Sequence, residues 1–228
     1  MNDDFSPLSA FAGMARLFPL PNLVFFPQVM QPLHIFEPRY CQMTADALAG
    51  DRLVALVLPK PGWEGAYEGC PSLHPVACLG KIVADQKMPD GRYNILLRGL
   101  SRIQINQEIP HGKAYRKAKT ELLAEVPVAD AKLERRLRRK LAKLVPLLFP
   151  KQPEVKDQFR KLLKSDLTLS ALCDIFAFAL PLEVEFKQIL LEELEVEERL
   201  ARLLKQLENN PAAEAASERK FPPEFSVN

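Results

Sequence analysis

The first half of the chain takes its fold from residues 76–106, VACLGKIVADQKMPDGRYNILLRGLSRIQIN. Residues 76–84 are mostly apolar, which predicts a strand, and residues 93–97 predict the strand that returns beside it. Between them, Asp90-Gly91 tolerates a positive φ and is typical of a hairpin turn. Residues 100–106 then alternate apolar and polar side chains, as a strand with one buried face does. The stretch therefore predicts a hairpin followed by a further strand.

Short apolar runs continue on both sides of this hairpin. Residues 53–58, LVALVL, predict a buried strand that ends at Pro59, and residues 114–121 predict an edge strand. One helix is expected from Pro38, which suits a first helical turn, to Gly50, which suits a C-cap. The first half is therefore expected to be rich in strands.

From about Asp130 the apolar residues recur at helical spacing. We expect helices over residues 130–148, 154–163, 168–180 and 181–207. Pro146 is expected to kink or shorten the first of them, because proline removes a backbone donor. The change of period predicts an α+β fold.

Charge and composition limit the classes of function. The chain has 228 residues, 47% of them hydrophobic, and 31 basic against 29 acidic residues give a net charge of +2. With so small a net charge, the chain has no overall electrostatic field that would attract nucleic acid or a membrane. The apolar runs are too short to cross a bilayer, and Asp3 and Asp4 stand where a secretory peptide would be basic. The chain is predicted to be cytoplasmic, with no membrane partner.

The sequence offers no catalytic constellation. A phosphate-binding loop needs the pattern GxxxxGK[ST], but Gly80-Lys81 is followed by Ile82 and has Pro75 where the first glycine should stand. A GxSxG nucleophile turn does not occur. We therefore predict that the chain is not an enzyme and has neither catalytic residues nor a cofactor.

Cys70, His74 and Cys78 form the one cluster of soft metal ligands, with the spacing CxxxHxxxC. A closed zinc site needs four ligands and usually begins with a pair two to four residues apart. Loop and core positions are the favoured interpretation, since free cysteine behaves mostly as a small hydrophobic residue. No metal site is predicted.

The loop of residues 59–75 is the strongest candidate for binding. Four prolines and three glycines surround Trp63 and Tyr67, and Trp63 is the one tryptophan of the chain. Aromatic rings on a stiffened surface loop bind apolar peptide at a low entropic cost. The alternative is that Trp63 folds back onto the core. With Phe25 and Phe26, these residues form the tentative peptide-binding set.

The basic helix near residues 132–143 admits two interpretations. It could hold phosphates, but it has no aromatic residue on which a base could stack. A solvated or partner-facing surface is favoured.

Several segments resemble the amino-terminal, substrate-binding domain of Lon protease. Residues 17–27, LFPLPNLVFFP, and 32–40, PLHIFEPRY, look like its opening, and residues 81–105 resemble its central hairpin. Residues 174–204 are similar to its end. The resemblance covers about residues 16 to 208, and the order and spacing of the pieces make it fairly specific.

The resemblance implies a PUA-like β-barrel followed by an α-helical bundle. The expected parts are an extension (1–15), a PUA-like β-rich subdomain (16–125), a helical subdomain (126–208) and a flexible tail (209–228). Because the chain ends where the ATPase and protease modules of Lon would begin, it looks like a stand-alone substrate-binding-domain protein. No catalytic residue can be carried over.

The leading interpretation is a non-enzymatic module that binds unfolded or exposed apolar polypeptide segments. It would act as an adaptor or chaperone-like partner in proteolysis, with a protease as a candidate partner. The alternative is an RNA-binding module, since fold relatives of the barrel bind RNA; that inference rests on fold analogy. The client and the oligomeric state stay open.

Overall fold

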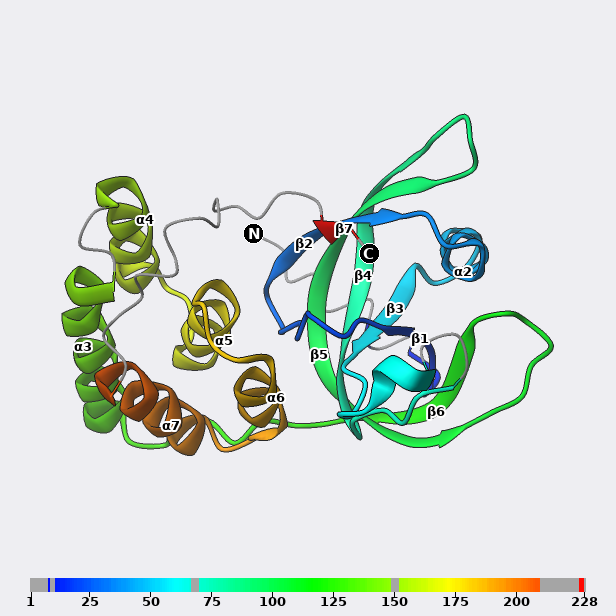
Figure 1. Cartoon of the computed structure of the whole chain (residues 1–228). Helices are drawn as coiled ribbons and strands as arrows, with labels where there is room; N and C mark the ends of the chain where they lie inside the picture. The colour runs from blue at the N-terminus through cyan, green and yellow to red at the C-terminus, as the bar shows by residue number, and fades with distance from the viewer. Residues whose placement is uncertain (1–7, 9–10, 67–69, 149–151, 210–225, 228) are drawn as a thin grey trace. The chain divides into compact units, whose positions relative to one another are not determined.

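The computed structural model describes residues 8, 11–66, 70–148, 152–209 and 226–227 of the chain (Figure 1). It forms two compact units, one of residues 1–123 with 224–228 and one of residues 124–223. The first unit is built on a sheet and the second on helices, so the α+β class is confirmed. No helix in the described ranges is long and apolar enough to cross a membrane.

The β unit contains a mixed seven-stranded sheet in the order β4-β3-β1-β6-β5-β2-β7. β4 also pairs with β5, so the path of pairings from β4 through β3, β1, β6 and β5 returns to β4. The β1–β3 and β2–β7 pairs are parallel and the others antiparallel. The strands are β1 (Met14–Pro19), β2 (Met30–Ile35), β3 (Leu53–Val57), β4 (Val76–Lys87), β5 (Tyr93–Glu108), β6 (Arg116–Leu122) and β7 (Ser226–Val227).

Apolar side chains from five of these strands form the core of the β unit. Leu17 of β1, Val57 of β3, Leu79 of β4 and Ile103 of β5 are buried together, and Ala118 of β6 joins them. Helix α2 (Pro38–Leu48) is confirmed and begins with proline in its first turn. Its Tyr40 ring lies 4.4 Å from the ring of Phe18, between centroids.

Residues 76–108 form a hairpin of two strands, β4 and β5, and not the hairpin with a further strand that the sequence predicts. The turn at Asp90-Gly91 is confirmed, with Gly91 at φ +89°. The predicted strands at 93–97 and 100–106 are a single strand, β5. Gly99 does not end it: its amide donates to the Val29 carbonyl (2.9 Å) and its carbonyl accepts from the Gln28 amide (3.0 Å). The glycine is needed for this close approach of two backbones.

The helical unit comprises α3 (Ala131–Leu148), α4 (Pro153–Lys164), α5 (Leu169–Ala179), α6 (Val184–Glu192) and α7 (Val196–Asn209). α3 continues two residues beyond Pro146. α5 begins with a side-chain cap, in which the Thr168 hydroxyl accepts from the Ala171 amide at 3.1 Å.

The prediction of one long helix over residues 181–207 is wrong. The chain leaves the helix at Glu193 and resumes it at Val196. In between, the Val126 amide donates to the Leu194 carbonyl (3.0 Å) and the Val196 amide donates to the Val126 carbonyl (3.1 Å). These bonds to a distant segment replace helical bonds, so the break has a tertiary cause.

Strands of the β unit include residues that the sequence analysis placed in the N-terminal extension and in the C-terminal tail. β1 already includes Met14 and Ala15, which the sequence analysis placed in an extension. Ser226 and Val227, expected in a flexible tail, form β7 beside Leu33 and His34 of β2.

Candidate functional site

The four residues of the tentative peptide-binding set do not form one surface. Phe25 and Phe26 are buried in the β unit. A Cβ atom on Gly80 would lie 3.0 Å from the Phe25 ring, and one on Gly99 would lie 2.1 Å from the Phe26 carbonyl oxygen. This packing makes both phenylalanines core residues and removes them from the set. Tyr67 lies outside the described residues.

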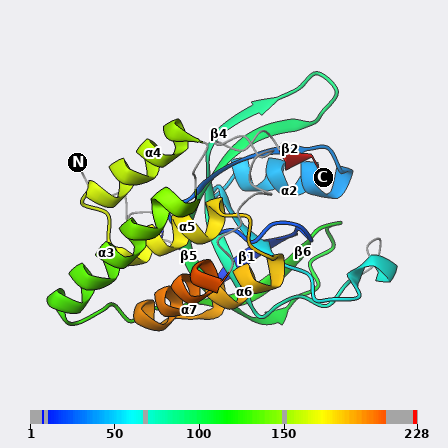
Figure 2. The same ribbon diagram turned by 60° about the vertical axis from the view of Figure 1, so that its left-hand side comes forward.

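Trp63 keeps a position on the predicted loop. It begins the short 3-10 helix η1 (Trp63–Ala66) and is half-buried. The base of the loop is held by backbone bonds from the Lys60 amide to the Ser72 carbonyl (2.7 Å) and from the His74 amide to the Leu58 carbonyl (2.9 Å). Figure 2 shows this short helix at the outer end of the loop, away from the strands. The loop therefore carries Trp63 at the start of this short helix.

A groove between α3 and α4 lies in the helical unit, with a volume of about 590 Å³. Residues of α3 and α4 contribute both apolar and cationic side chains to it. The lining residues are Arg135, Arg138, Arg139, Ala142, Arg160, Leu163 and Lys164.

One of these arginines has a structural role. The Arg138 guanidinium donates to the Leu163 carbonyl (3.1 Å), the Ser165 carbonyl (3.0 Å) and the Leu167 carbonyl. It satisfies carbonyls at the C-terminal end of α4, where a helix leaves such groups unpaired. Arg138 therefore fixes α3 against the end of α4 and sets the width of the groove.

The other cationic side chains of the groove are exposed to solvent. Arg160 lies 3.3 Å from Asp157, and both side chains are exposed. Within the described part of the chain, Arg135, Arg139 and Lys164 have no acidic partner within 4 Å. Arg135 and Arg139 lie one turn apart on α3, so they present neighbouring positive charges. A segment with apolar and acidic side chains would complement this lining.

The sequence analysis predicted only one of the two helices that form this groove. The basic helix near residues 132–143 was interpreted as a solvated or partner-facing surface, but the contribution of α4 was missed. Its signal was the pair Arg160 and Lys164, four residues apart and therefore on one helix face. The face of α3 that Arg160 and Lys164 oppose depends on how the two helices pack, which nearby residues in the sequence do not determine.

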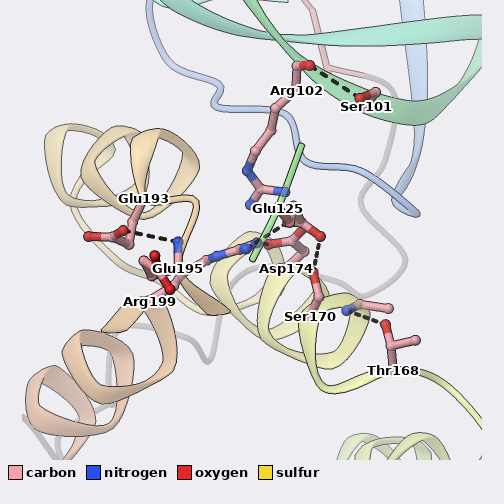
Figure 3. A network of polar contacts seen from close by, with 10 residues as sticks. Ser101, Arg102, Glu125, Thr168, Ser170, Asp174, Glu193, Glu195 and Arg199 are labelled. Atoms are coloured by element: carbon pink, nitrogen blue, oxygen red, sulfur yellow. Dashed lines mark hydrogen bonds and ion pairs between the residues drawn. The ribbon is translucent and has the colours of Figure 1, made fainter. Parts of the chain in front are cut away.

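A second polar cluster has a buried ion pair at its centre. The Arg199 guanidinium on α7 donates to Asp174 of α5 and to Glu125, both at 2.6 Å, and the Ser170 hydroxyl donates to the other oxygen of Glu125 (2.6 Å). Figure 3 shows these side chains converging. The Arg199 side chain is 0% and the Asp174 side chain 1% exposed. The cluster joins elements of the helical unit and offers no entry to a substrate.

The groups with shifted pKa values lie in the β unit. Burial raises the pKa of the Cys41 thiol, and burial together with a hydrogen bond to Asp46 (2.9 Å) raises the pKa of Tyr115. On the hairpin, hydrogen bonds from Arg92 lower the pKa of Asp90, and the same contact raises the pKa of Arg92. Each shift follows from a local structural contact and none marks an acid–base pair in the groove.

The metal-ligand spacing of Cys70, His74 and Cys78 does not assemble a site. Among the described residues, no group of three or more His, Cys, Asp or Glu side chains is placed to hold an ion. Cys78 is buried in β4, whereas Cys70 is exposed.

Comparison with known proteins identifies relatives over most of the chain. Residues 14–209 match the family model described as the ATP-dependent protease La (LON) substrate-binding domain. A Lon protease of Syntrophus aciditrophicus is 30% identical over 89% of this chain and 26% of its own length. One of Dictyoglomus thermophilum is 28% identical, over 82% and 23% respectively. The chain thus spans about a quarter of the length of these curated relatives.

Solved structures show the same fold. The Lon N-terminal domain protein from Xanthomonas campestris superimposes with a TM-score of 0.61 at 21% identity, covering 84% of this chain and 97% of that one. The N-terminal domain of the Mycobacterium avium complex Lon protease gives 0.67 at 18% identity, covering 86% and 98%.

Proposed function

This chain belongs to the ATP-dependent protease La (LON) substrate-binding domain family, and we propose that it binds polypeptide segments without catalysing a reaction. In this proposal it serves as an adaptor or chaperone-like partner in proteolysis, with a protease as its candidate partner. The alternative function, RNA binding, finds no support among the relatives described above. The proposed ligand is an exposed segment that combines apolar and acidic side chains.

The observation that carries this proposal is the groove between α3 and α4. Ala142 and Leu163 supply apolar surface, while Arg135, Arg139 and Lys164 surround it with charge. The aliphatic stems of arginine and lysine add to the apolar surface while their charged ends stay hydrated. Such a lining suits a short stretch of unfolded chain better than a flat or purely charged surface would.

The free energies of the contacts that this groove can make favour broad specificity. An exposed ion pair contributes only about 0 to 1 kcal/mol, so no single arginine can select one sequence. Apolar contact adds about 25 cal/mol for each Å² buried, whatever the order of the side chains. A ligand is therefore selected by composition, which suits a module that meets many polypeptides.

We expect Arg139→Glu to weaken binding of a short fluorescent peptide made of leucine and glutamate by about tenfold. The substitution replaces an attraction with a repulsion, and each exposed contact of this kind is worth up to about 1 kcal/mol. Fluorescence anisotropy at low and high salt measures the loss, which should shrink as salt rises.

Arg136→Glu is the matched control, because Arg136 is exposed on the same helix but does not line the groove. It changes the net charge by the same amount and should leave the affinity nearly unchanged. Equal losses in the two variants would mean that only the overall charge matters, and the groove would then not be the binding site.

Trp63 and Tyr67 stay in the proposal as a second, apolar contact on the loop. Trp63→Ala should weaken capture of an unfolded model protein by about 1 to 3 kcal/mol, the usual loss for an aromatic anchor, while Trp63→Phe should retain most of it. Denaturant melts on the same variants test the alternative. A loss of about 3 to 5 kcal/mol in folding stability would assign Trp63 to the core instead.

Finer features of the fold belong to the same proposal. The return of strand pairings from β5 to β4 supports a PUA-like β-barrel, and the packing of α3 with α4 and of α5 with α7 supports a helical bundle. Subdomains at about 16–125 and 126–208, and a cytoplasmic location, also remain proposals.

A further inference from the structure

The outer edge of β2, the side that faces away from β5, is paired over only two residues in the described part of the chain. On one side, all of Met30–Ile35 pairs with β5. On the other side, Leu33 and His34 pair in parallel with Ser226 and Val227 of β7, the last described residues of the chain (Figure 1). In the described residues this two-residue strand is the whole cover of that edge.

The register shows which backbone groups face outward. The Gly99 amide donates to the Val29 carbonyl, one residue before the Met30–Arg98 pair, so Val29 takes a bonded position of the ladder. In an antiparallel ladder bonded pairs alternate with non-bonded ones. Pro32 and His34, which fall in the non-bonded positions, therefore direct their backbone polar groups to the outer edge. Proline is tolerated in a strand only where its missing amide faces such an edge.

Apolar side chains flank this edge. Met30 at the start of β2 is 43% exposed, and Phe36, just beyond its end, is 37% exposed. Because side chains two apart share one face of a strand, Met30, Pro32, His34 and Phe36 line the same side. The Phe36 ring stacks on the His34 ring with 6.2 Å between centroids. The edge thus offers a row of backbone groups with exposed apolar side chains at both ends.

We propose that the outer edge of β2 binds an extended apolar segment of a client polypeptide as an added strand, and that β7 is an internal competitor for that edge. This rests on the proposed function and names one mode by which the same module takes its ligand. Residues 224–228 read EFSVN, with apolar residues two positions apart, which is the alternation that an added strand needs. Ser226 and Val227, the part of this sequence that pairs with β2, therefore belong to a stretch that resembles the ligand that would displace it.

Competition from within the chain sets a limit on affinity. The apparent dissociation constant rises in inverse proportion to the fraction of molecules whose edge is free. If β7 covers the edge in two thirds of molecules, opening it would tighten binding about threefold. A ladder of only two residues can be displaced readily, so a longer client segment has the advantage.

The test uses the full chain and a fluorescent peptide, FPPEFSVN, that copies residues 221–228. Ser226→Pro removes the ladder amide of β7 and should tighten peptide binding about threefold, whereas Ser226→Ala should leave it unchanged. Added to Ser226→Pro, His34→Pro should abolish binding because it removes the outward amide of β2. His34→Ala, which loses the side-chain bond to Asn94 and the ring contact with Phe36 but keeps this amide, should not. No difference between the two Ser226 variants would overturn the competitor role.

Two further measurements distinguish a failure of the edge proposal from a failure of the proposed function. Hydrogen exchange at the His34 amide should accelerate in Ser226→Pro and slow again when the peptide is added, which reports on the edge even if His34→Pro fails to fold. An unfolded model protein should displace the peptide. If that protein binds the chain but does not displace the peptide, the edge proposal fails and the proposed function stands; if the protein does not bind at all, both fail.

Discussion

Gly99→Ala should destabilise the β unit by about 4 kcal/mol, which is among the largest losses expected of a single substitution. The added Cβ would lie 2.1 Å from the Phe26 carbonyl oxygen and 2.9 Å from its carbon, both of them backbone atoms. The clash cannot be relieved by turning a side chain, so the two backbones must separate. The bonds from Gly99 to Gln28 and Val29 would then be lost, at about 1 kcal/mol each.

A denaturant melt followed by circular dichroism measures this loss, with Gly91→Ala as its control. Gly91 has a positive φ, but a Cβ there would meet nothing within 4 Å. Its substitution should cost about 1 kcal/mol from backbone conformation alone. If the two variants lose the same stability, the close approach of Gly99 to Phe26 is not what holds the segment in place.

Arg199→Met should cost about 3 to 5 kcal/mol of folding stability, because it leaves the buried carboxylate of Asp174 without its partner. Glu125 also loses a bond, but its side chain is 30% exposed and can be hydrated. The effect should therefore come mainly from Asp174. Chemical denaturation of the full chain measures it.

Two comparisons isolate the cause of that loss. The double variant Arg199→Met with Asp174→Leu should recover much of the stability, since an apolar pair of similar size often replaces a buried ion pair without loss. Arg160→Met, which breaks the exposed pair with Asp157, should change stability by less than about 1 kcal/mol. A double variant no more stable than Arg199→Met alone would show that packing, and not the unpaired charge, causes the loss.

Features that depend on near neighbours in the chain were predictable. The hairpin turn at Asp90-Gly91, the buried strand β3 and the helix α2 each follow from residues within a few positions of one another. The change from a period of two to a helical period gave the α+β class for the same reason. The family resemblance rested on such segments in their order along the chain.

The site was only partly predictable. The basic residues of α3 were evident, but a groove needs a second wall, and α4 supplies it through the contacts of Arg138 with the end of that helix. Phe25 and Phe26 were placed in the tentative peptide-binding set but are buried. Their burial depends on Gly80 and Gly99, which lie more than fifty residues further along the chain.

Local pattern alone thus determined the class of the fold and some of its elements, β3 and α2 among them. The tertiary structure decided that β5 runs on through Gly99, that the last helix breaks where Val126 bonds to Leu194 and Val196, and that β7 lies on β2. The physical reason is the range of the interactions. Turn chemistry and side-chain periodicity act between residues a few positions apart, whereas backbone pairing and close packing join segments whose separation along the chain leaves no local signal.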